Sequence, residues 1–268
     1  MSKEKSSGLG AMFQWLVVLG ALAVAWVVYL CILGDPSNFE GGDLTKNPLP
    51  GNYMGIMYKG GVIVPELMAL FIIVFAFSIE RLITLVAASG KQSIDSFMST
   101  IRHLLSTAEI DTASAECDKQ QGALANVIKS ALKKYSEMEK EEGMDKEQKV
   151  LAIQKEVEEA TALELPMLEK NLVFLSTIST VATLIALLGT VLGMIKAFAA
   201  LSAGGAPDSQ ALATGISEAL VNTALGIGTS AVAIIMYNVF TTKIDKVTYS
   251  IDEAGFSIVQ TFAANHKK

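Results

Sequence analysis

The sequence predicts an all-α polytopic membrane protein with four transmembrane helices and long helices that extend into the cytoplasm. Its 268 residues are 51% hydrophobic and only 18% charged, with a mean hydropathy of +0.44, which is typical of membrane proteins. Two runs, 171–195 and 219–242, contain no charged side chain. Because about 20 apolar residues cross a bilayer as a helix, both runs are long enough to span it.

The same composition argues against several classes of function. The net charge is -6 and the sequence holds no Lys and Arg cluster free of acids, so we expect no nucleic-acid partner. Cys31 lies in an apolar run and Cys117 in a polar one, so we expect no disulfide between them. His103 and His266 lack the spacing of metal ligands. Without a nucleophile and base motif or a phosphate-binding loop, we expect no enzyme, no cofactor and no metal site.

The first segment, 1–34, carries Lys3 and Lys5 and then an uncharged run. A secretory signal peptide is the alternative interpretation. However, the apolar core 12–33 exceeds the usual length of about 7 to 15 residues, and no small-x-small cleavage site precedes Asp35. We therefore predict an additional transmembrane helix, retained in the protein, with its N-terminus in the cytoplasm.

The next two segments predict a loop and a second span. Residues 35–61 are rich in Gly, Pro and Asn and show no apolar period, which indicates an external, periplasmic loop. Residues 62–88 form the second spanning candidate, with Glu66 near one end and the pair Glu80 and Arg81 near the other. We expect these charged groups at the two interfaces, with Arg81 marking the cytoplasmic end.

The segment 89–171 is rich in Lys and Glu with apolar residues at helical spacing, so we predict a cytoplasmic helical domain. Asp145 is a candidate N-cap. The helix that follows, from Lys146, is expected to continue into the membrane with a kink at Pro166. The last segment, 241–268, is expected to form an amphipathic cytoplasmic tail. Its apolar residues are Ile251, Phe256, Val259 and Phe262.

The distribution of basic residues predicts the topology. Residues 81–170 contain twelve Lys or Arg, whereas the loop 34–61 contains two and the turn 199–211 contains none. Cytoplasmic segments near membrane spans carry an excess of Lys and Arg. We therefore expect four spans with both termini in the cytoplasm.

The hairpin 172–240 carries the candidate site. A turn signal at 204–207, with the sequence GGAP, joins its two apolar helices. The antiparallel register then brings Thr190, Thr223 and Glu218 to about one membrane level. A charged residue at the centre of a spanning helix costs about 2.5 to 3.5 kcal/mol on insertion scales, so an acid there is usually functional.

An acid in this position needs a hydrogen-bond donor. Asn222, one turn after Glu218, is the first candidate donor. Lys196 is a second candidate, although we expect it to extend to the external headgroups instead. For the hydroxyls of Thr183 and Ser230, close helix packing explains the pattern as well as a polar path does. A polar lane with one acid favours protons. One acid per chain does not complete a path, so either several copies form a ring or a second protein supplies another titratable group.

Three stretches of this hairpin resemble the ExbB, TolQ and MotA proton-channel family, and ExbB most closely. They are residues 187–194 (LLGTVLGM), residues 215–226 (GISEALVNTALG) and Tyr237–Asn238. The spacings of 28 residues from Thr190 to Glu218 and 5 from Glu218 to Thr223 also agree with the family.

The resemblance implies a homopentamer in a bacterial inner membrane, surrounded by lipid, with an ExbD-like single-span protein in its central pore. The proton motive force would then drive a TonB-like protein for outer-membrane nutrient import. By the same resemblance Thr190 and Thr223 would line the proton path, and Glu218 would assist it. Thr183 and Asn222 complete the set of pore-lining candidates.

Two departures from the family pattern keep alternatives open. Thr183 stands where family members usually carry a proline, and the helix in 1–34 gives four spans where ExbB and TolQ commonly have three. Four spans are typical of MotA. A TolQ-like or MotA-like stator subunit for another process is therefore an alternative, and so is a non-conducting membrane scaffold. The sequence does not identify the receptor or cargo, the partner stoichiometry, or the roles of 1–34 and 241–268.

Overall fold

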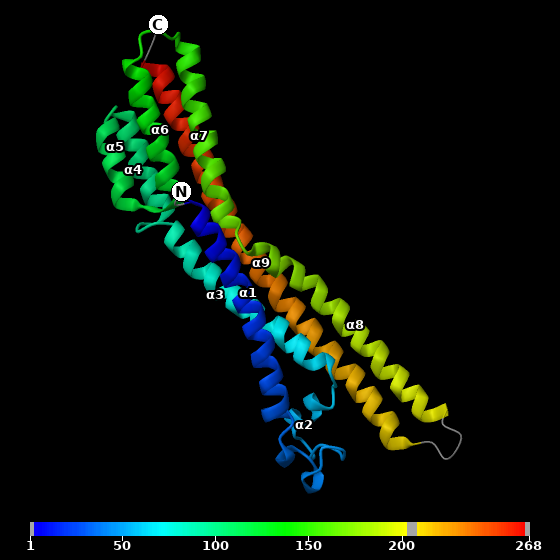
Figure 1. Cartoon of the computed structure of the whole chain (residues 1–268). Coiled ribbons are helices and arrows are strands. Elements are labelled where there is room, and N and C mark those ends of the chain that lie inside the picture. Colours follow the sequence, from blue (N-terminus) through cyan, green and yellow to red (C-terminus); the bar gives the residue numbers. More distant parts are fainter. Residues whose placement is uncertain (1–2, 203–207, 266–268) are drawn as a thin grey trace. The chain divides into compact units, whose positions relative to one another are not determined.

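The computed structural model describes residues 3–202 and 208–265, and within these ranges the chain is helical with no β-strand (Figure 1). The long helices are α1 (Lys3–Val28), α3 (Ile63–Ala88), α4 (Ile94–Ser106), α5 (Ile110–Gln120), α6 (Gly122–Lys140), α7 (Lys146–Glu169), α8 (Leu172–Ser202) and α9 (Ser209–Asn265). The short ones are the π-helix η1 (Tyr29–Leu33), the 3-10 helices η2 (Pro36–Asn38) and η3 (Glu40–Gly42), and α2 (Tyr53–Tyr58). The predicted all-α class is confirmed. The predicted turn at 204–207 lies outside the described residues.

Within the described residues, four helices are long and apolar enough to cross a membrane. They comprise Gln14–Leu33, Ile63–Ala88, Leu172–Ser202 and Ser209–Asn265. Their number agrees with the four spans predicted from the sequence. The chain divides into two compact units, the first made of Met1–Ile79 and Val173–Tyr237 and the second of Glu80–Leu172 and Asn238–Lys268.

The first unit has a buried cluster that joins η1, which continues α1, to α3 and α9. Tyr29, Leu33 and Val64 are buried together, and Val221 and Leu225 of α9 pack against them. These side chains are apolar or aromatic and come from segments far apart in the sequence. The cluster therefore holds the end of α1 and the start of α3 against α9.

The predicted loop 35–61 belongs to the first unit and folds back on the end of α1. The Asn38 side chain donates hydrogen bonds to the carbonyls of Ile32 and Leu33 at 2.8 and 3.1 Å. These carbonyls lie at the end of η1, where helix carbonyls need outside donors. Asn52 in turn donates to the Asn38 side-chain oxygen at 2.9 Å. The loop is thus fixed to η1 by hydrogen bonds.

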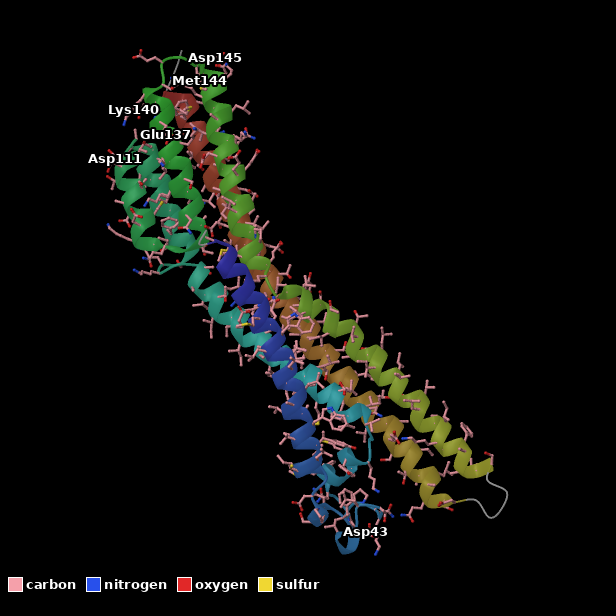
Figure 2. All side chains as sticks on the ribbon, in the orientation of Figure 1. Asp43, Asp111, Glu137, Lys140, Met144 and Asp145 are labelled. Atoms are coloured by element: carbon pink, nitrogen blue, oxygen red, sulfur yellow. The ribbon has the colours of Figure 1, made fainter. Side chains whose placement is uncertain are left out.

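The second unit is a helical bundle made of α4 to α7 and the last part of α9. Tyr135 of α6 packs edge-on against Phe262 of α9, with ring centroids 4.9 Å apart. Asp145 caps α7 as predicted. Its side chain accepts a hydrogen bond from the Gln148 backbone N–H at 2.8 Å, and the Gln148 side chain accepts one from the Asp145 backbone N–H, which together form a capping box. Lys140 and Asp145 mark the two ends of the α6 to α7 connection in Figure 2.

The segment 241–268, expected as an amphipathic tail, is the end of α9 as far as Asn265. Ile251 and Phe262 are buried in the second unit, as their spacing indicates. Phe256 is instead 64% exposed. The amphipathic pattern therefore describes part of this segment, which contributes a buried face to the bundle.

The helix expected to run from Lys146 into the membrane is interrupted, so that expectation is wrong. Pro166 lies inside α7 without ending it. The chain turns instead at Asn171, whose φ is +66°, a left-handed conformation that Asn tolerates better than most residues. The Asn171 side chain donates to the Glu80 carboxylate at 3.0 Å. This hydrogen bond to Glu80, which is distant in the sequence, therefore holds the chain at the break between α7 and α8.

Arg81, expected to mark an interface, is almost fully buried in the second unit. Its guanidinium donates to both carboxylate oxygens of Glu80 at 2.5 and 2.7 Å. It also donates to the carbonyls of Met167 and Leu168, each at 3.3 Å. Both carbonyls belong to the last turn of α7, which has no partner within the helix. Arg81 thus supplies hydrogen-bond donors to two carbonyls at the end of α7.

We predict that Arg81→Met lowers the free energy of unfolding by about 2 kcal/mol, because it leaves two carbonyls at the end of α7 without a donor and the half-buried Glu80 carboxylate without its cation. Denaturant unfolding of the full chain in detergent measures this change. Lys129→Met is the matched control: it removes the exposed ion pair with Asp118, which should contribute less than about 1 kcal/mol. Equal losses in the two variants would contradict the role given to Arg81.

The thiol of Cys117 in α5 gives a second prediction. Burial raises the pKa of this thiol from its usual 9.0 to about 12, so the folded state favours the neutral form. The stabilisation is fully present below the unfolded pKa and is lost as the pH rises through the folded pKa. In a Cys31→Ser chain at about pH 8, we expect iodoacetamide to label Cys117 only after denaturation. Mass spectrometry measures the labelling, and rapid labelling of the native chain would refute the buried placement.

Candidate functional site

The candidate site lies in the first unit, where α8 and α9 approach each other closely. Gly193 of α8 and Gly215 of α9 face the opposite helix, and a Cβ added to either would lie 2.7 Å from backbone atoms across the contact. Gly226 is packed against Ala186 in the same way. Small residues at such positions allow membrane helices to pack with their backbones near each other. This contact brings the polar side chains of α8 near those of α9.

Thr190 of α8 and Thr223 of α9 meet across this contact. Their hydroxyl oxygens are 2.5 Å apart. Each hydroxyl also lies within hydrogen-bond distance of a carbonyl one turn earlier in its own helix, Ala186 at 3.0 Å and Ala219 at 2.9 Å. A hydroxyl both donates and accepts. The pair therefore forms a short polar link inside an otherwise apolar hairpin.

Glu218 pairs with Lys196, contrary to the sequence-based expectations for both residues. The Lys196 ammonium lies 2.6 and 2.8 Å from the two carboxylate oxygens of Glu218, and Glu218 is 5% exposed. The Lys196 ammonium is thus directed at the acid. Side chains on a helix lean toward its N-terminus, which directs Glu218 toward Lys196, whereas Thr223 lies five residues farther along α9.

Asn222 is fully buried and does not serve as the donor to Glu218 that the sequence suggested. Its amide nitrogen donates to the carbonyl of Gly60 at 3.0 Å. A Cβ on Gly189 would lie 2.7 Å from the Asn222 side chain. Asn222 therefore joins α9 to the segment between α2 and α3. Thr183 is half-buried on α8, seven residues before Thr190, and is not part of the hydroxyl pair.

The segment between α2 and α3 covers Glu218, a contact that the sequence did not reveal. Gly61 has a φ of +78°, and a Cβ at this position would lie 2.5 Å from a Glu218 carboxylate oxygen. Just before it, the carbonyl of Tyr58 accepts a hydrogen bond from the Tyr29 hydroxyl at 3.0 Å, and the two rings stack with centroids 4.8 Å apart. The additional helix α1 is thereby linked through Tyr58 to the surroundings of the acid.

A polar cavity of about 390 Å³ leads to the ion pair. Its lining includes Thr45, Lys59, Lys196, Asp208, Gln210 and Glu218. Lys59 is held by the loop, donating to the carbonyls of Leu44 and Thr45 at 2.8 and 3.2 Å. Burial lowers the pKa of Lys59, and the nearby charge of Asp43 opposes that shift. Charged and polar groups therefore surround the approach to Glu218.

The arrangement contains the parts that a proton relay needs. Glu218 can take up and release a proton, and the hydroxyls of Thr190 and Thr223 can pass one along a hydrogen-bonded chain. Among the described residues, no group of three or more His, Cys, Asp or Glu side chains is placed to hold a metal ion.

Comparison with known proteins places this site in a family context. Residues 119–253, half of the chain, match the sequence model of the MotA/TolQ/ExbB proton channel family. The hydroxyl pair and the ion pair all lie within the matched range. The family resemblance inferred from the sequence is therefore confirmed.

Three relatives illustrate the match. An ExbB-like biopolymer transport protein of Synechocystis sp. is 40% identical over 86 residues, 31% of this chain and 41% of the relative. The Tol-Pal system protein TolQ of Pseudomonas aeruginosa is 24% identical over 155 residues, 58% of this chain and 67% of the relative. The biopolymer transport protein ExbB of Helicobacter pylori is 38% identical over 78 residues, 29% of this chain and 54% of the relative. The match to the Synechocystis protein covers less than half of its length.

The close helix contact yields a prediction with an internal control. Gly215→Ala should lower the free energy of unfolding by about 1 to 3 kcal/mol, the usual cost of overpacking, because the new methyl group meets the backbone of α8. Gly228→Ala on the same helix should cost nothing, since no atom lies within 4 Å of its added Cβ. Denaturant unfolding of both variants compares them. Equal stability would show that α8 and α9 do not depend on this approach.

Proposed function

The chain belongs to the MotA/TolQ/ExbB proton channel family, and on that premise we propose that it conducts protons as a subunit of an inner-membrane motor. The motor would couple the proton motive force to mechanical work. The observation that carries this proposal is the hydroxyl contact of Thr190 and Thr223, five residues along α9 from the acid Glu218, in a hairpin that is otherwise apolar. The membrane potential supplies the energy for this work, since each charge that crosses 100 mV releases about 2.3 kcal/mol.

The rest of the hairpin supports assembly with other chains. Apolar side chains remain exposed along both helices, among them Leu184, Leu187 and Val191 on α8 and Ile227 and Ile234 on α9. Such surfaces are satisfied by lipid or by neighbouring helices. The proposed assembly is a homopentamer around an ExbD-like single-span protein, in a bacterial inner membrane with both termini in the cytoplasm.

The proposed output is the movement of a TonB-like protein during outer-membrane nutrient import. The names of the ExbB relatives include biopolymer transport, which favours this output. The similarity to a Tol-Pal system protein favours a TolQ-like motor as the second candidate. Both candidates use the same proton path, so one experiment on the path applies to either.

A non-conducting scaffold is the competing proposal, because threonine and glycine also serve simply to pack helices. The two proposals differ in what the polar groups do. In a channel, removal of the hydroxyls leaves the complex assembled and stops the proton. In a scaffold, the same change weakens the assembly.

We predict that Thr190→Ala with Thr223→Ala, and separately Glu218→Gln, reduce proton flux by about a hundredfold or more, the lower end of the loss expected when a proton-transferring group is removed. The measurement is dye-reported acidification of proteoliposomes that contain the purified complex, driven by a potassium diffusion potential. Native mass spectrometry checks assembly.

Thr242→Ala is the control for this experiment, because the Thr242 hydroxyl bonds only within α9, to the carbonyl of Asn238. It should conduct like the unaltered protein. Unchanged flux in the Thr190 and Thr223 double variant would exclude the proposed path. Dissociation of its complex, with the control intact, would favour the scaffold.

A further inference from the structure

The ion pair between Lys196 and Glu218 is unequal in its surroundings. The Lys196 side chain is 58% exposed, whereas that of Glu218 is 6% exposed. Both carboxylate oxygens accept from the same ammonium. The acid is therefore enclosed, and its cation occupies the side that opens to the polar cavity.

We propose that Lys196 is a positioning residue that keeps Glu218 ionised and turned toward the cavity, so that Glu218 takes up a proton only as the ion pair opens. The step is a simple proton transfer. The carboxylate gains one proton from a hydronium ion in the cavity, which is left as water, and the ammonium keeps all of its own protons. This inference rests on the proposed function and deepens it, since it assigns a regulator to the acid in the path.

The contacts around Glu218 explain why the pair controls the acid. On one side Gly61 leaves no room, because even a methyl group there would meet the carboxylate. On the other side stands the ammonium of Lys196. A cation within hydrogen-bond distance favours the charged form of an acid, while burial favours the neutral form. Loss of Lys196 removes this cation and leaves the enclosed carboxylate without its donor.

The position of Lys196 argues against an incidental surface contact. An exposed ion pair contributes little, because water solvates both partners. Here water reaches Lys196 but hardly reaches Glu218. A lysine near the end of a spanning helix usually extends to the headgroups, and Lys196 instead points its ammonium at the acid. Its exposed stem also gives it freedom to move into the cavity when the pair opens.

Other charged and titratable groups face the same acid and contribute to its pH dependence. Lys59, from the loop, and Asp208, just before α9, line the cavity with opposite charges. The Tyr29 hydroxyl, from η1, interacts electrostatically with Glu218. Of these groups, Lys196 is the one whose ammonium lies within hydrogen-bond distance of both carboxylate oxygens. Removal of Lys196 should therefore have a larger effect than removal of Lys59.

The test is an infrared pH titration of the Glu218 carboxyl band in the full complex, reconstituted in lipid nanodiscs. The band is assigned by its absence in Glu218→Gln. With Lys196→Gln, we expect the midpoint of protonation to rise by about one pH unit or more, as expected when an acid loses a neighbouring cation. Lys196→Arg should keep the midpoint near that of the unaltered protein. Lys246→Gln, which removes an exposed ion pair with Asp95, is the control and should leave the midpoint unchanged.

An unchanged midpoint in Lys196→Gln would overturn the proposal. If Lys196→Gln fails to fold, the double variant Lys196→Gln with Glu218→Gln decides. If the double variant folds, the misfolding of Lys196→Gln was caused by the uncompensated Glu218 carboxylate, which supports the proposal. If the double variant also fails to fold, Lys196 has a purely structural role. The titration does not depend on proton flux, so the two proposals can fail separately. If flux survives the loss of the Thr190 and Thr223 hydroxyls but Lys196→Gln still shifts the midpoint, the proposed proton path is rejected. The effect of Lys196 on Glu218 is then retained.

Discussion

The close approach of α8 and α9 is the constraint on which the site depends. Gly193 and Gly215 allow the two backbones to come near enough for short side chains to meet. The hydroxyls of Thr190 and Thr223 have little reach, so their contact requires this separation. Lys196 has a long flexible side chain and could tolerate a wider gap. The hydroxyl pair therefore depends on the helix contact more strictly than the ion pair does.

The loop between α1 and α3 supplies a second constraint, on the acid. Tyr29 holds Tyr58, and three residues later Gly61 lies directly against Glu218. Asn222 bonds the same segment at Gly60. Through these contacts the additional helix α1 helps to define where the carboxylate can turn. Its role thus includes the support of the site as well as the contact with lipid expected from its exposed apolar face.

The features that the sequence predicted correctly are those set by local pattern. Uncharged runs identified the spans, and regular spacing on two antiparallel helices brought Thr190 to Thr223. The features that it missed depend on contacts between distant segments. The long side chains of Lys196 and Arg81 can reach several partners, so spacing alone does not select one. The break at Asn171 depends on Glu80, which lies far away in the chain, whereas Pro166 gave a stronger local signal.

The polar groups of the hairpin lie at two successive positions along the helices, and this order is suited to protons. Lys196 and Thr190 are six residues apart, or about 9 Å along a helix at 1.5 Å per residue. The outer position is charged and adjoins a polar cavity. The inner one holds only two hydroxyls in direct contact, which leaves no hydrated space between them for a larger ion. A proton needs no such space, because it can pass by exchange of hydrogen bonds, and in the proposed function the ion pair controls its entry.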